Sequence, residues 1–97
     1  METKEIALPS QKVMQHACKL ACANDKPIML DYWLDSHISG KVLIGVRGTD
    51  EKILVRSEEE YTSPISKVYK VGEEFILITE NSIYIVSSKI QSRKINT

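Results

Sequence analysis

Residues 68–86 read VYKVGEEFILITENSIYIV, and this segment has the clearest structural pattern in the chain. Apolar and β-branched side chains dominate it, interrupted twice by residues that favour tight turns. Gly72-Glu73 fits a two-residue type II′ turn, in which glycine supplies the positive φ, and Glu80-Asn81 fits a second turn. The predicted strands are 68–71, 75–79 and 83–86. They form a three-stranded antiparallel meander whose middle strand is apolar on both faces, so each face needs a cover.

Upstream of this meander, residues 10–24 have the spacing of an amphipathic helix. Apolar side chains recur three and four residues apart, and the Ser10 hydroxyl is placed to accept hydrogen bonds from first-turn amides. Pro27 prevents the helix from continuing. We expect this helix, Ser10 to Asn24, or else a second copy of the protein, to cover one face of the meander.

Between the helix and the meander, apolar residues alternate with polar ones, which predicts further strands. The segments concerned are 28–35, 42–46 and 53–55. Gly48–Glu51 would join the last two as a hairpin, with Arg47 opposite Lys52. Residues 57–60 match a capping box, which favours a short helical turn, and an acidic solvated loop fits them equally well.

These elements predict an α+β fold: an N-terminal helix followed by a five- to six-stranded curved antiparallel sheet or small barrel. A chain of 97 residues is long enough for one domain, here 1–97. We expect 1–8 and 90–97 to be frayed termini, since nothing in their sequence ties them to the rest.

The composition is that of a globular protein with no dominant charge. Apolar residues make up 42%, and 13 basic residues balance 13 acidic ones, so no overall field attracts nucleic acid or a membrane surface. No apolar stretch approaches the roughly 20 residues of a membrane span. Cys18 and Cys22 lie four apart on one flank of the predicted helix, which suits a disulfide poorly. We expect free thiols that serve as small core residues, and hence a reducing, cytoplasmic location.

One group of residues resembles a catalytic or metal site: Asp31, Asp35 and His37. On an extended strand, residues four apart are separated by about 13 Å, too far for two carboxylates to share a metal or a sugar bond. The group converges only if the chain bends sharply at Asp35. Glycine-rich phosphate loops and nucleophile-elbow motifs are missing from the sequence. We therefore expect a protein that is not an enzyme and that needs no metal or cofactor.

Two surfaces are candidates for binding. Basic side chains of the hairpin would share one face and contact an anionic partner; they are Lys41, Arg47, Lys52 and Arg56. Apolar side chains would line one face of the meander and contact a protein partner or a second copy; they are Ile76, Ile78, Ile83 and Ile85, extended by Tyr69. An ordinary solvated face and a sheet that curls to bury itself are the alternatives. The favoured function is a small non-catalytic interaction or structural module, and the alternative is a small nucleic-acid-binding β-barrel.

Part of the hairpin resembles the first motif of Sm-like barrels. Gly40, Gly45 and Asp50, followed by Ile53-Leu54-Val55, carry this resemblance. The chain departs from the family where it lacks the RNA-contacting asparagine after the aspartate, and where the second motif needs an Arg-Gly pair. The resemblance therefore implies the barrel outline and not the RNA-binding residues.

Three further stretches are similar to uncharacterised small proteins of large DNA viruses that infect algae and protists. They are Lys26–Trp33, Glu60–Ile65 and Ile83–Val86. This resemblance implies a virus-encoded accessory or virion protein made in the cytoplasm of the infected cell, and it implies no catalytic residue.

Overall fold

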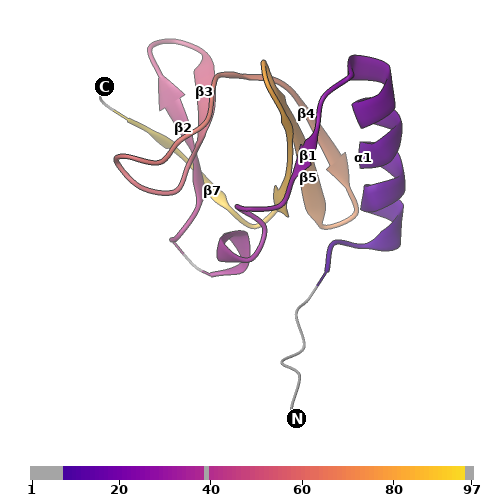
Figure 1. The fold of residues 1–97 in the computed structure, drawn as a ribbon. Helices are drawn as coiled ribbons and strands as arrows, with labels where there is room; N and C mark the ends of the chain where they lie inside the picture. Colours follow the sequence, from indigo (N-terminus) through magenta and orange to yellow (C-terminus); the bar gives the residue numbers. More distant parts are fainter. Residues whose placement is uncertain (1–7, 39, 96–97) are drawn as a thin grey trace.

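The computed structural model describes residues 8–38 and 40–95 and has an α+β fold. The helix α1 spans Gln11–Asn24, and a short 3-10 helix, η1, spans Asp35–His37. The strands are β1 (Ile28–Met29), β2 (Leu43–Arg47), β3 (Glu51–Val55), β4 (Ile65–Val71), β5 (Glu74–Thr79), β6 (Ile83–Ser87) and β7 (Gln91–Lys94). The strands lie in two sheets, of order β1-β6-β5-β4 and β3-β2-β7 (Figure 1).

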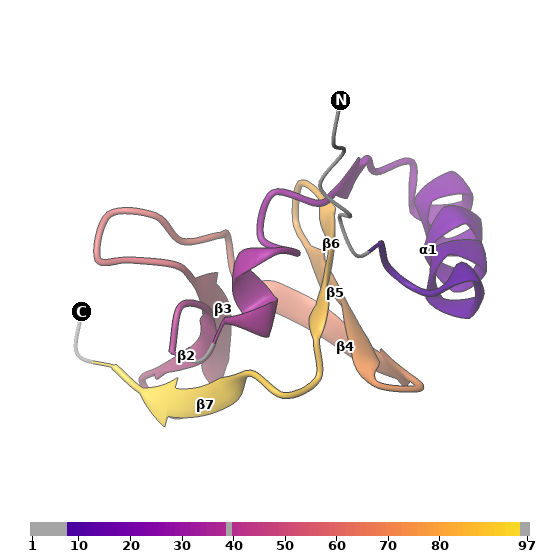
Figure 2. The same ribbon diagram turned by 90° about the horizontal axis from the view of Figure 1, so that it is seen from below.

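This architecture corrects two expectations. The part of the chain that the structure describes forms seven strands instead of five or six, and its two sheets do not close into a barrel. Neither sheet is purely antiparallel, since β1 pairs parallel with β6 and β2 pairs parallel with β7. The result is a three-layer arrangement, with α1 on one side of the four-stranded sheet and the three-stranded sheet on the other (Figures 1 and 2).

The helix begins and ends where its sequence predicts. The Ser10 hydroxyl accepts a hydrogen bond of 3.2 Å from the Val13 amide and so caps the first turn. The carboxylate of Glu74 in turn accepts bonds from the Ser10 amide, at 2.9 Å, and from the Ser10 hydroxyl, at 2.7 Å. This pair of bonds fixes the start of the helix to β5. At the other end, Asp25 adopts the left-handed conformation with φ 54°.

The meander is confirmed, and both of its faces are covered. Gly72 has a φ of 61° in the turn between β4 and β5, as the sequence requires. One face packs under α1, where Val13, Ala17 and Trp33 complete a core. The other face, with Leu77 and Val86, packs against the three-stranded sheet.

This packing corrects the expected apolar interface. The four isoleucines assigned to it are 0–3% exposed beneath α1; they are Ile76, Ile78, Ile83 and Ile85. A helix whose own buried residues are as small as Val13 and Ala17 can approach the sheet closely, and Trp33 fills the remaining space. These side chains form a core and offer no contact surface in the folded chain.

The segment predicted as a strand over 28–35 is mostly a turn. Only Ile28 and Met29 pair, with β6, after which the chain turns at 31–34 and enters η1. Tyr32 and Trp33 are adjacent but are buried in different cores, Tyr32 between the two sheets and Trp33 under α1. The turn carries the chain from one layer to the other, and burial of both aromatic rings favours it over a longer strand.

The hairpin register differs from the expected one by one residue. Arg47 lies opposite Glu51, and Val46 lies opposite Lys52, around a three-residue loop. An opposite-charge pair thus replaces the like-charge pair that the sequence reading placed there. The slip also exchanges the faces, so that Arg47 and Lys52 point to opposite sides of the sheet.

Three smaller expectations can be compared with the structure. Residues 91–94 are not frayed but form β7, which pairs with β2, whereas residues 1–7 lie outside the described part of the chain. For residues 57–60, a helical turn and an acidic loop fitted the sequence equally well, and the structure has the loop: residues 56–59 form bends, and the Ser57 hydroxyl accepts bonds from the amides of Glu59 and Glu60, as in a capping box. Cys18 and Cys22 are free thiols, as expected, but both are exposed on α1 and not in the core.

Candidate functional site

The four basic residues assigned to the hairpin do not form one anion-binding face. Arg47 is held by Glu51, with Nη2 to Oε1 at 2.7 Å, and it lies on the face opposite to Lys52. Arg56 is held by other acidic side chains. Lys41 is exposed before β2. The two arginines thus have internal counter-ions, which lowers their value as ligands for an external anion.

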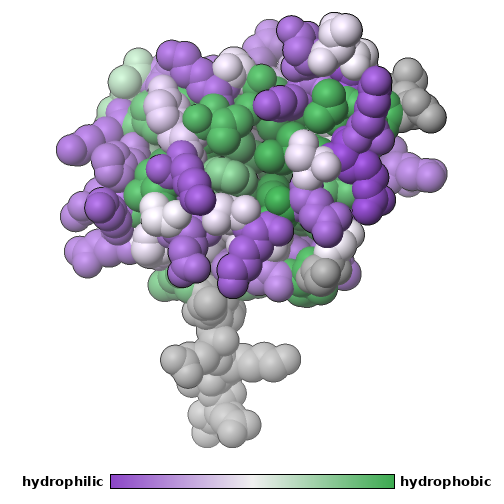
Figure 3. Space-filling model, turned by 180° about the vertical axis from the view of Figure 1, so that it is seen from behind, coloured by the Kyte–Doolittle hydropathy of each residue, from purple (hydrophilic) through white to green (hydrophobic). Residues whose placement is uncertain are grey.

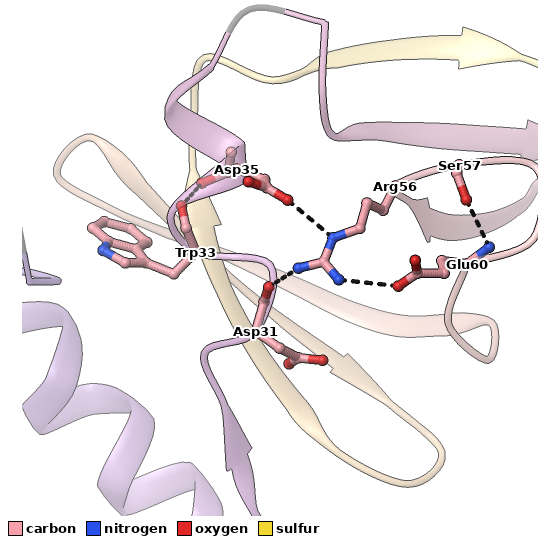
Figure 4. A network of polar contacts seen from close by, with 7 residues as sticks. Asp31, Trp33, Asp35, Arg56, Ser57 and Glu60 are labelled. Atoms are coloured by element: carbon pink, nitrogen blue, oxygen red, sulfur yellow. Dashed lines mark hydrogen bonds and ion pairs between the residues drawn. The ribbon is translucent and has the colours of Figure 1, made fainter.

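Arg56 is the centre of a polar network that joins the hairpin to the turn before η1 (Figure 4). Its Nη1 donates to Oε2 of Glu60 at 3.0 Å, and its Nε lies 3.1 Å from Oδ2 of Asp35, an ion pair without the alignment of a hydrogen bond. Nη2 donates to the Asp31 carbonyl, and the guanidinium carbon lies 4.7 Å from the centre of the Tyr32 ring. The hydrogen bond to Glu60, with help from the charge of Asp35, raises the pKa of Arg56.

The group Asp31, Asp35 and His37 does lie on a sharp bend, but it does not converge on a site. The Asp35 carboxylate faces Arg56, and the His37 ring packs edge-on against Trp33, with centroids 4.3 Å apart. Within residues 8–38 and 40–95, no three side chains of His, Cys, Asp or Glu are placed to hold a metal ion. In this fold the carboxylate of Asp35 and the main-chain carbonyl of Asp31 position Arg56.

The longest of the edge strands, β4, offers an open surface. It ends the four-stranded sheet, and the described residues include no strand paired with its outer edge. All five central residues, 66–70, are exposed, including two large apolar ones, Val68 at 43% and Tyr69 at 38%. Of the predicted interface residues, Tyr69 alone therefore reaches the surface.

A groove of about 530 Å³ runs between β4 and α1. Its floor is apolar, with Leu20, Tyr69 and Val71, and its rim is basic. The basic residues are Lys12, His16 and Lys19 of α1; Lys70 of β4 also lines the groove, but it lies opposite Phe75 and its side chain points to the other side of the sheet. No aspartate or glutamate lines the described part of the groove. Seen from behind, on the side where β4 lies, apolar side chains gather at the middle of the face with polar ones around them (Figure 3).

Sequence reasoning missed this groove although it named Tyr69. The helical spacing of Lys12, His16 and Lys19 places them along one flank of α1. That flank faces β4 only because α1 lies across the meander, which local pattern does not determine. The available signal was an uninterrupted basic flank on the helix together with the Lys67 and Lys70 side chains of an edge strand.

No protein-family model matches this chain, and no curated protein or solved structure resembles it closely enough to count as a match. The viral resemblance therefore stays a prediction. Among the described residues, no helix has both the length and the apolar character needed to cross a membrane.

Proposed function

We propose that this protein is a small non-catalytic interaction module that binds an acidic, extended protein segment along β4. The observation that carries the proposal is a seven-residue edge strand, open on its outer side, beside a groove with a basic rim. An added strand would continue the sheet through main-chain hydrogen bonds, which is a common mode of peptide recognition. The proposed binding surface is thus the outer edge of β4, and not the face formed by the four buried isoleucines.

Charge complementarity favours an acidic partner. Within the described residues, Lys12 and Lys19 form no ion pair, so their charges are not neutralised internally. Aspartate or glutamate side chains of an added strand would meet these ammonium groups over an apolar floor. Such contacts speed association and select the partner, and they weaken as salt screens the charges.

Side-chain alternation along β4 decides which of its side chains an added strand would contact. Tyr69 lies opposite Ile76 and Lys67 opposite Ile78, so both point to the side of the sheet that α1 covers. Val68, opposite Leu77, points to the other side. An added strand would place its own alternate residues beside Tyr69 and Lys67, next to the groove.

A nucleic acid fits the groove less well. Binding of single strands relies on several aromatic side chains on which successive bases stack. The groove offers one aromatic ring, that of Tyr69. The open edge of β4 also has no role in binding a phosphate backbone, whereas it is central to strand addition.

The test is a titration of the isotope-labelled protein, followed by NMR, with a peptide of alternating Glu and Val. We expect amide shifts at 66–70 and along α1, with a dissociation constant that rises with salt. Lys12→Glu and Lys19→Glu should each weaken binding about tenfold, because each replaces an attraction by a repulsion. Lys52→Glu is the matched control, since Lys52 is an exposed strand lysine outside the groove.

Other occupants are outcomes of the same experiment. Shifts at 66–70 with an oligonucleotide but not with the peptide would overturn the proposal in favour of nucleic acid. A dimer in light scattering that Lys12→Glu does not disrupt, with no peptide binding, would show that another copy or another surface serves instead. If Lys52→Glu weakened peptide binding equally, the effect would come from the net charge of the protein and not from the groove.

A further inference from the structure

A second hollow, separate from β4, lies at the junction of the two sheets. It has a volume of about 360 Å³ and is bounded by η1, the start of β2, the end of β6 and β7. This volume lies within the range of small-molecule sites. The hollow exists because β7 returns alongside β2 and encloses space that a frayed terminus would leave open.

The charged side chains that line this hollow are basic. Lys89 and Arg93 line it, and neither forms an ion pair with any residue of 8–38 or 40–95. His37 lines it as well. None of its described lining residues is aspartate or glutamate. A neighbouring hollow that shares His37, Ser87 and Lys89 contains Glu73 and Glu74; the Glu74 carboxylate is bound by Ser10, and that of Glu73 forms no ion pair with the described residues.

A buried hydroxyl adds a further donor. Ser87 lines the hollow and is 4% exposed. Its oxygen accepts a bond of 3.2 Å from the Lys89 amide, but its proton has no acceptor among the residues that the structure describes. A buried donor without an acceptor is costly, and a ligand oxygen would satisfy it.

We propose that this hollow binds a phosphate monoester that carries a small apolar group. Two side chains with fixed positive charge, Lys89 and Arg93, match the charge of a phosphate dianion, and a guanidinium can bind two phosphate oxygens at once. Apolar side chains, among them Val42 and Ile90, form the remaining wall and would contact the organic group. The site shares no residue with the β4 groove, so either proposal can fail alone.

The experiment is an NMR titration of the full chain with phenyl phosphate, inorganic phosphate and benzoate. We expect phenyl phosphate to shift the amides of 36–38 and 87–93 and to bind more tightly than the other two. Arg93→Gln should weaken phenyl phosphate binding about tenfold or more, since it removes a charged hydrogen-bond donor. Ser87→Ala should weaken it less, and Lys52→Gln, outside the hollow, should leave it unchanged.

Each of the following results would contradict the proposal of a phosphate site. Shifts scattered over the lysines of α1, or equal weakening by Lys52→Gln, would reveal non-specific charge attraction. Equal binding of benzoate would overturn the assignment of phosphate. No shift at 36–38 and 87–93 with millimolar phenyl phosphate would overturn the site itself. Arg93 is exposed on β7, so Arg93→Gln should fold, and a dispersed amide spectrum of the variant checks this.

Discussion

Removal of the Arg56 side chain tests the interaction that joins the hairpin to the turn before η1. The perturbation is Arg56→Met, which keeps the length of the side chain and removes its charge and donors. Arg56 contacts the Asp31 carbonyl, the carboxylates of Asp35 and Glu60, and the Tyr32 ring. Residues 31–35 and Arg56 lie far apart in the chain, so the loss should weaken a tertiary contact.

The magnitude follows from these contacts. The hydrogen bond from the charged guanidinium to the carbonyl contributes about 1.5–3 kcal/mol, and the ring contact about 0.5–1 kcal/mol. The carboxylates of Asp35 and Glu60 are 30% and 58% exposed, so solvent screening reduces each ion pair to about 0.2–1 kcal/mol. These contacts share one charge and are not additive, so the expected loss of stability is about 2–4 kcal/mol.

The matched control is Arg47→Met. Arg47 is exposed to the same degree as Arg56, 27% against 25%, but its ion pair is with Glu51 alone. We expect the control to lose about 0.2–1 kcal/mol. In urea unfolding, where a small domain has an m-value of about 1–2 kcal/mol per molar, Arg56→Met should lower the midpoint by at least about 1 M. Equal midpoints for the two variants would refute the reasoning, because the network would then be worth no more than one surface ion pair.

Two further predictions concern the cores. Ile85→Ala should destabilise the protein by about 2–5 kcal/mol, because Ile85 is fully buried under α1, whereas Val68→Ala on the open edge should change stability by less than about 0.5 kcal/mol; similar urea midpoints would show that the isoleucine face is not a core. Burial, with the charge of Asp31 as a second cause, raises the pKa of Tyr84 above its ordinary value of 10.0. The stabilising effect of neutral Tyr84 should therefore be complete below pH 10 and be lost as the pH rises through its folded-state pKa. Tyr84→Phe should reduce the fall of the urea midpoint above pH 10, because phenylalanine does not ionise. An unchanged pH profile in the variant would contradict this assignment.

At Gly45 two segments of the chain approach each other closely, which the sequence indicates only weakly. A Cβ on Gly45 would lie 2.8 Å from Cδ1 of Ile95 and 3.0 Å from Cγ2 of Val55. The glycine thus leaves room for the segment after β7 to cross β2. In the sequence, Gly45 interrupts a strand pattern, which indicates such an approach but not the residue that makes it.

The candidate sites were harder to predict than the elements that carry them. Arg47, Lys52 and Arg56 were named as one face on the assumption of a register that the structure shifts by one residue. Because strand side chains alternate, that single shift separates Arg47 from the other two. Tyr69 belongs to the apolar contact face that the sequence predicts; it is 38% exposed, and the groove beside it depends on where α1 lies.

The local elements of this protein follow from short-range patterns in the chain. Helix α1 and the meander of β4, β5 and β6 follow from spacing, from Ser10 as a cap and from Gly72 in its turn, all of which act within a few residues. Only the tertiary structure decided which faces are buried, that the segment after β1 turns, and that β7 pairs with β2. Those outcomes depend on contacts between residues far apart in the chain, where competition for buried area selects one arrangement among several that the same local pattern allows.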